Sequence, residues 1–151
     1  MRGGGSVRRG EVRGAPVAMS SFEGKTRVSV GAASVAIPEA LLPAGQSLDS
    51  PSNFFEGLGM SVLIDQGPFS DDLTSAVGHA EYRETTEQVA GVPAKVVSYR
   101  DPGGTGYIVA AHIPGLNRLT VVVRASDSVP RQVADEVIDS IEAAESNKRE
   151  E

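Results

Sequence analysis

The fold is decided by residues 94–124, which read AKVVSYRDPGGTGYIVAAHIPGLNRLTVVVR. Three runs rich in Val, Ile and Tyr, at 94–100, 107–113 and 118–124, are separated by connectors that contain Pro and Gly. Runs of β-branched and aromatic residues bounded by such connectors are typical of strands joined as hairpins. The stretch therefore predicts three consecutive antiparallel strands.

A helix is predicted directly after these strands, over residues 130–145. Ser128 precedes it as a candidate cap, and Pro130 suits the first turn because proline lacks only an amide that the helix would leave unbonded. Apolar residues recur at helical spacing and form one stripe: Val133, Ala134, Val137, Ile138 and Ile141. Such a stripe must be buried, so we expect this helix to pack across the sheet.

The first half of the chain adds further strands and one long irregular segment. Alternating patterns predict strands at 25–30, 34–38 and 60–65, and the polar run 82–89 indicates an edge or connecting strand. A short helix is expected at 73–80, capped by Ser70, whereas residues 39–59 read as a loop rich in Pro, Gly and Ser. The predicted class is α+β, an antiparallel sheet of about five to seven strands with the C-terminal helix packed on it.

The chain has 151 residues, a length that predicts one domain. Residues 1–20 hold five Gly, four Arg and one Glu, so their charge is +3 and the remaining 131 residues carry −9. We expect a disordered basic tail at 1–20, a single domain at 21–145 and a frayed charged tail at 146–151. An alternative start of translation at Met19 would remove most of the first tail.

Composition excludes several functions. The net charge of −6 and the pI near 4.9 argue against a general nucleic-acid binder, which needs a basic surface. No Cys is present, so disulfides, thiolate metal sites and cysteine nucleophiles are excluded. No long apolar run and no signal-peptide pattern is recognised, because residues 15–19 are too short an apolar stretch. A cytoplasmic protein without a membrane span is therefore expected.

Candidate catalytic and metal-binding residues are few and scattered. The two histidines, His79 and His112, have no second ligand at a compatible spacing, and the acidic group at residues 70–72 is better explained by helix capping than by calcium. The glycine-rich stretch 101–106 lies between two strands, whereas a phosphate loop leads into a helix. No serine stands in a Gly-x-Ser-x-Gly elbow. These patterns predict a non-enzymatic protein that needs no cofactor.

Two binding sites are conceivable instead. Several basic residues lie on the polar side of their predicted strands. If these strands are neighbours, Arg27, Arg118 and Arg124 form a patch that could bind an acidic protein partner. An ordinary solvated sheet face explains the same pattern. The second candidate is a pocket for a small apolar ligand between the sheet and the 39–57 loop, lined by Phe54, Phe55 and Leu58. The expected function is a binding or accessory protein, with a small-ligand carrier as the alternative and a hydrolase ranked last.

The order of elements resembles the PsbP-like α/β/α sandwich superfamily over about residues 21–145. Three short motifs carry the resemblance: Val35-Ala36-Ile37-Pro38, Gly91-Val92-Pro93-Ala94 and Val137-Ile138-Asp139-Ser140-Ile141. The resemblance implies a non-enzymatic protein, since this superfamily includes photosystem accessory subunits, a factor that binds the GTPase Ran, and exported or lipid-anchored bacterial proteins. The chain departs from it in lacking a signal peptide, a lipid-anchoring Cys and an aromatic residue at Glu39-Ala40, so no functional residue is carried over.

Overall fold

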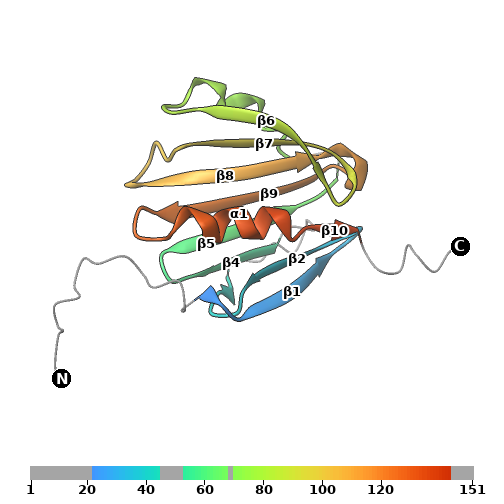
Figure 1. Ribbon diagram of the computed structural model, residues 1–151, viewed down its shortest axis with the longest axis horizontal. Coiled ribbons are helices and arrows are strands. Elements are labelled where there is room, and N and C mark those ends of the chain that lie inside the picture. Colours follow the sequence, from blue (N-terminus) through green and yellow to red (C-terminus); the bar gives the residue numbers. More distant parts are fainter. Residues whose placement is uncertain (1–21, 45–52, 68–69, 144–151) are drawn as a thin grey trace, which may run out of the picture.

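The structure is a computed structural model, and it describes residues 22–44, 53–67 and 70–143. The tails predicted at 1–20 and 146–151 lie outside these ranges. Seven strands form one antiparallel sheet in the order β3-β4-β5-β9-β8-β7-β6, and three more form a smaller sheet in the order β1-β2-β10 (Figure 1). The class is α+β, as the sequence predicts.

The large sheet is built mainly from consecutive hairpins. Its strands are β3 (Leu42–Pro43), β4 (Asn53–Gly57), β5 (Met60–Asp65), β6 (Arg83–Val89), β7 (Val92–Arg100), β8 (Gly106–Ile113) and β9 (Leu119–Ser126). The three strands predicted within 94–124 are β7, β8 and β9, and they are paired as antiparallel neighbours. The polar strand β6 occupies one edge of the sheet, as its sequence indicates.

The prediction of a loop at residues 39–59 is partly wrong. This segment contains β3 and β4, which extend the large sheet beyond β5. Strand β4 joins β5 through Leu58 and Gly59, which both have positive φ, 53° and 81°. Two positive φ values in a two-residue hairpin loop are typical of a type I′ turn, whose twist matches that of the flanking strands. The many Pro, Gly and Ser residues of this segment favour a loop, and for that reason the sequence did not predict the hairpin.

The smaller sheet also departs from the prediction of one continuous sheet. Strands β1 (Lys25–Val30) and β2 (Ala33–Pro38) form the expected hairpin, but β2 pairs on its other side with β10 (Glu142–Ala143). The chain folds this hairpin over the helix side of the large sheet, because Val35 and Ile37 share one hydrophobic core with Val62 and Ile64.

Helix α1 (Arg131–Asp139) crosses the same side of the large sheet and contacts β2, β8 and β9 (Figure 1). All five residues of the predicted stripe are buried. The helix is shorter than predicted, however, because the chain turns at Ser140 and pairs with β2. The Ala36 amide donates a hydrogen bond to Ser140 Oγ at 2.8 Å and so fixes this end of the helix. Ser128 does not cap the helix; its hydroxyl lies 2.7 Å from that of Ser126.

The two faces of the large sheet are covered differently. The inner face, which packs against α1 and β2, carries Val62, Ile64, Val109, Val121 and Val123. The outer face is covered over β7 and β8 by the segment 70–82, which contains the short 3₁₀ helix η3 (Thr74–Gly78). Leu73 from this segment packs on Val97, Ile108 and Ala110. The predicted helix at 73–80 is therefore a single 3₁₀ element, and Ser70 hydrogen-bonds the Arg118 carbonyl instead of capping it.

Candidate functional site

The outer face over β4, β5 and β9 carries two adjacent cross-strand rows of different character. Phe54 pairs with Leu63, and Leu63 pairs with Val122, so half-buried apolar side chains form one row. Because side chains alternate, the next row on this face contains Glu56, Ser61 and Arg124. Neighbouring strands lie about 4.8 Å apart, so the Cα atoms of Glu56 and Arg124 are separated by about 10 Å.

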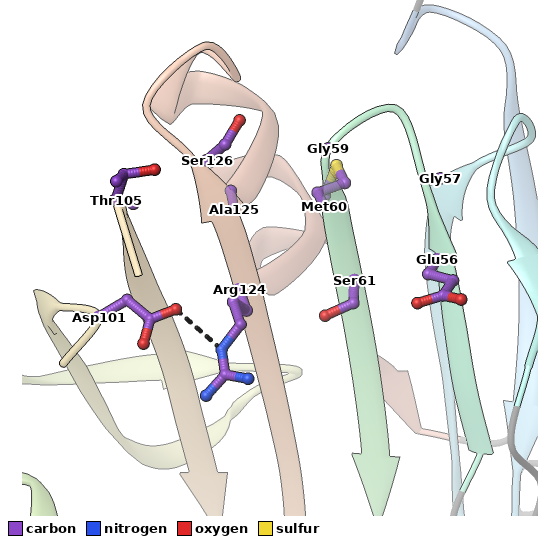
Figure 2. Close-up of a pocket in the computed structure, with 11 residues that line it drawn as sticks. Glu56, Gly57, Gly59, Met60, Ser61, Asp101, Thr105, Arg124, Ala125 and Ser126 are labelled. Atoms are coloured by element: carbon purple, nitrogen blue, oxygen red, sulfur yellow. Dashed lines mark ion pairs between the residues drawn. The ribbon is translucent and has the colours of Figure 1, made fainter. Parts of the chain in front are cut away.

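An open trough with a volume of about 620 Å³ runs along this polar row. Glu56 and Ser61 line it from β4 and β5, and Arg124 lines it from β9. The hairpin loop between β7 and β8 adds Asp101 and Thr105 (Figure 2). The trough therefore combines two carboxylates, one guanidinium and several hydroxyl groups from β4, β5, β8, β9 and the β7–β8 loop.

Asp101 holds Arg124 in a defined orientation. One carboxylate oxygen, Oδ1, accepts a hydrogen bond from the Gly103 amide at 3.0 Å, and the other, Oδ2, lies 3.1 Å from Arg124 Nε. The Asp101 side chain is only 10% exposed, whereas that of Arg124 is 62% exposed. Figure 2 shows the terminal nitrogen atoms of Arg124 pointing away from Asp101. The carboxylate thus positions the guanidinium and leaves its Nη groups open.

Arg100 provides a contrast within the same molecule. Its two Nη atoms bind the two oxygens of Asp127 at 2.8 and 3.0 Å. This hydrogen bonding lowers the pKa of Asp127 and raises that of Arg100. A bidentate pair of this kind occupies both Nη groups, the fork of the guanidinium, which would otherwise bind a carboxylate or phosphate. Arg124 is paired through Nε and keeps its fork, so the two arginines differ in what they can bind.

The floor of the trough depends on a glycine. At Gly106, the first residue of β8, a Cβ atom would meet the carbonyl oxygen of Ala125 in β9. Only glycine allows the two backbones to approach this closely. The glycine-rich stretch 101–106 is therefore a hairpin loop, as the sequence indicates, and its last glycine has a packing role.

The three arginines of the predicted patch do not lie together. Arg27 is on β1 of the small sheet, where it contacts Ser34, the Ser140 carbonyl and Glu142. Arg118 precedes β9 and Arg124 is near its end, six residues away and therefore separated by about 20 Å along the strand. Of these residues, Arg124 alone lines the trough. Strand order, which the sequence does not reveal, is the reason for the error.

The three side chains predicted to line an apolar pocket do not lie together either, and residues 45–52 of the 39–57 loop are outside the described residues. Phe54 and Phe55 are consecutive in β4 and therefore point to opposite faces. Phe55 is buried in the inner core, Phe54 lies half-buried on the outer face, and Leu58 is exposed in the hairpin turn. These three side chains cannot line one cavity.

The histidines have separate environments. His79 stacks on Tyr99 with ring centroids 4.8 Å apart. His112 is half-buried on the outer face, and burial lowers its pKa below the ordinary value of 6.5. Within residues 22–44, 53–67 and 70–143, no group of three or more His, Cys, Asp or Glu side chains could hold a metal ion. Across the same ranges, no helix is long and apolar enough to cross a membrane.

Sequence reasoning missed Glu56, Ser61 and Asp101 as members of a site. The sequence predicts a loop around Glu56 and a turn at Asp101, and neither pattern indicates a site. The register pairs Arg124 with Ile108 and Ile108 with Tyr99, so Asp101, two residues after Tyr99, reaches Arg124 only diagonally from the hairpin loop. The trough is thus recognised from tertiary structure. In comparisons with known proteins, no protein-family model matches the chain, and no curated protein shows a significant sequence match.

Proposed function

We propose that this protein is a non-catalytic binding protein that docks an acidic segment of a partner protein in the trough, with Arg124 as the anchor. The observation that carries the proposal is the Asp101–Arg124 pair, which fixes the guanidinium through Nε and leaves both Nη groups open. A carboxylate bound by this fork would form charge-assisted hydrogen bonds, which are stronger than neutral ones.

The rest of the trough supports recognition of a polypeptide rather than a reaction. Ser61, Thr105 and Ser126 offer hydroxyl groups, and Glu56 lies across the trough from Arg124 without an ion-pair partner among the described residues. Glu56 suits a basic side chain or an amide of the same partner segment. A partner with one acidic residue near Arg124 and a donor about 10 Å away would match both walls.

Membership of the PsbP-like superfamily is part of this proposal. An antiparallel sheet with a helix across one face agrees with that resemblance, and the resemblance implies accessory proteins without catalytic activity. The carrier alternative is less well supported, because Phe54 and Phe55 lie on opposite faces of β4.

The test uses hexaglutamate as a probe of an acidic extended segment, followed by side-chain and amide NMR shifts. We expect saturable shifts at Arg124 Nε, Ser61 and Thr105, and weaker binding as salt rises, because charges beyond about 8 Å are screened at physiological ionic strength. Arg124→Gln should reduce the affinity at least about tenfold, because loss of even one charge-assisted hydrogen bond costs about that factor. Arg100→Gln is the matched control and should leave binding unchanged, because the fork of Arg100 already binds Asp127.

Glu56→Gln provides an independent arm. Its carboxylate repels an all-acidic probe, so its removal should tighten hexaglutamate binding. The proposal is wrong if Arg124→Gln and Arg100→Gln weaken binding equally, since the attraction would then be nonspecific. Free glutamate that binds as well as the peptide would indicate a small-anion site instead of a protein-docking trough.

A further inference from the structure

A second hollow lies on the outer face, four residues further along β8 than the row of the trough. It has a volume of about 320 Å³. Lys95 from β7 and His112 from β8 are direct cross-strand partners on this face and line the hollow, and Asp72 faces them from the covering segment 70–82. Its apolar walls are the rings of Pro93 and Pro114, whereas Ala94 contributes backbone because its side chain is buried in the inner core. We name this hollow the His112 groove.

The hydrogen bonds behind His112 set its tautomer. Thr120 Oγ1 donates its only proton to the Asp71 carbonyl at 2.7 Å, because a carbonyl can only accept. The same oxygen lies 2.9 Å from His112 Nδ1 and must therefore accept a hydrogen bond from it. The neutral ring then carries its proton on Nδ1, and Nε2 keeps a free lone pair. Thr120 is buried, so water does not compete for the hydrogen bonds that set the His112 tautomer.

Lys95 brings a positive charge that has no direct partner among the residues that the structure describes. It is half-buried, and no described residue lies within hydrogen-bond or ion-pair distance of its ammonium group. Asp72 is held in place because its Oδ1 accepts hydrogen bonds from the Thr74 amide at 3.1 Å and from the Thr74 hydroxyl at 2.6 Å. The groove thus presents one cationic donor, one anionic acceptor and one neutral acceptor above an apolar wall.

We propose that the His112 groove binds a small zwitterion of the α-amino acid class with an apolar side chain. The ammonium group of the ligand would donate to Asp72 and to His112 Nε2, and its carboxylate would accept from Lys95. The side chain would lie against the rings of Pro93 and Pro114. A free carboxylate or a free amine satisfies only one half of this arrangement, so charge complementarity selects a molecule that carries both groups. This site is separate from the trough and does not depend on the function proposed for it.

The experiment compares L-leucine with two analogues that each lack one charged group, isocaproate without the amine and isoamylamine without the carboxylate. Imidazole ¹⁵N and lysine Nζ NMR signals report binding directly. We expect L-leucine or the smaller L-valine to shift His112 Nε2 and Lys95 Nζ saturably at millimolar concentration, and each analogue to bind at least about tenfold more weakly. Lys95→Gln should abolish the effect, whereas Arg124→Gln should leave it unchanged.

A pH series sharpens the test. His112 is faced by Asp72 and Asp71 and by the cations Lys95 and Arg118. Protonation of Nε2 removes the acceptor for the ligand ammonium, so leucine binding should weaken as the pH falls below the pKa of the ring. The proposal is overturned if neither amino acid shifts His112, if isocaproate or isoamylamine binds as well as leucine, or if Lys95→Gln leaves the affinity unchanged.

Discussion

The inner and outer faces of the seven-stranded sheet are made by alternate residues of the same strands, yet they differ in burial and in the side chains they carry. In β9, Val121 and Val123 are fully buried against α1, whereas Val122 is half-buried and Arg124 is exposed on the outer face. The inner face is one continuous apolar core, and the outer face combines a small apolar cluster under Leu73 with two hollows that charged side chains line. The two-residue period of a strand thus separates the buried core from the face that carries both hollows.

The largest effect should come from placing a charge on each face in turn. Val123→Asp buries an unpaired carboxylate between β9 and α1 and should cost more than about 4 kcal/mol of the free energy of unfolding. Val122→Asp, one residue earlier, should cost about 1–2 kcal/mol because water can still reach it. Urea unfolding measures both variants, and equal losses would contradict the division into a dry and an accessible face.

The cover of the outer face can be tested through Leu73. Leu73→Ala removes the buried side chain that packs on Val97, Ile108 and Ala110 and should cost about 2–4 kcal/mol in thermal or chemical unfolding. The control is Val77→Ala in η3, which directly follows Leu73; the Val77 side chain is 57% exposed, and a change below about 0.5 kcal/mol is expected. If both substitutions have small effects, segment 70–82 does not stabilise the sheet.

A smaller, favourable effect is expected at the turn beside the trough. Leu58 has φ of 53°, a left-handed conformation that asparagine adopts more easily than leucine. Leu58→Asn creates the Asn-Gly pair typical of a type I′ turn and should stabilise the protein by about 0.5–1 kcal/mol. Ala90→Asn is the matched variant, since Ala90-Gly91 forms the equivalent turn between β6 and β7 with φ of 56° and 80°. A loss of stability in both variants would contradict this account of the turns.

The smallest effect concerns pH and His112. Burial depresses the pKa of the folded ring below 6.5, so the unfolded chain binds a proton at a higher pH than the folded chain does. The contribution of His112 to stability is therefore fully present above pH 6.5 and is lost as the pH falls through the folded pKa. NMR titration of His112 gives that pKa, and denaturant midpoints on either side of it give the stability. His112→Asn should flatten the dependence in this window, and an unchanged slope would assign the effect to other groups.

Much of the fold could be predicted because local patterns agree with the tertiary structure. The runs in 94–124 predicted β7, β8 and β9, since β-branched residues between Pro- and Gly-containing connectors leave few alternatives. The stripe from Val133 to Ile141 predicted the buried face of α1 for a similar reason, its helical spacing. Strand β4 was missed because two aromatic residues in a Gly- and Ser-rich setting show no alternation, and β10 was missed because a two-residue strand has no pattern of its own.

The candidate sites, unlike the fold, could hardly be predicted from the sequence. Arg124 was predicted as a binding residue, but Asp101 and Glu56 reach it only through the register of β4, β5, β8 and β9. Arg27 was grouped with it because parity within a strand is visible in the sequence, whereas membership of a particular sheet is not.

By itself, the sequence determined the class of the protein, its antiparallel hairpins, the buried stripe of its helix and the absence of cysteine chemistry. These properties depend on residue type and on periods of two or 3.6 residues, which are local. Only the tertiary structure decided that β1 and β2 form a separate sheet, that Arg124 is anchored by Asp101 with its fork open, and that His112, Lys95 and Asp72 surround one groove. Such groupings depend on contacts between residues far apart in the chain, and nothing in their local sequence specifies them.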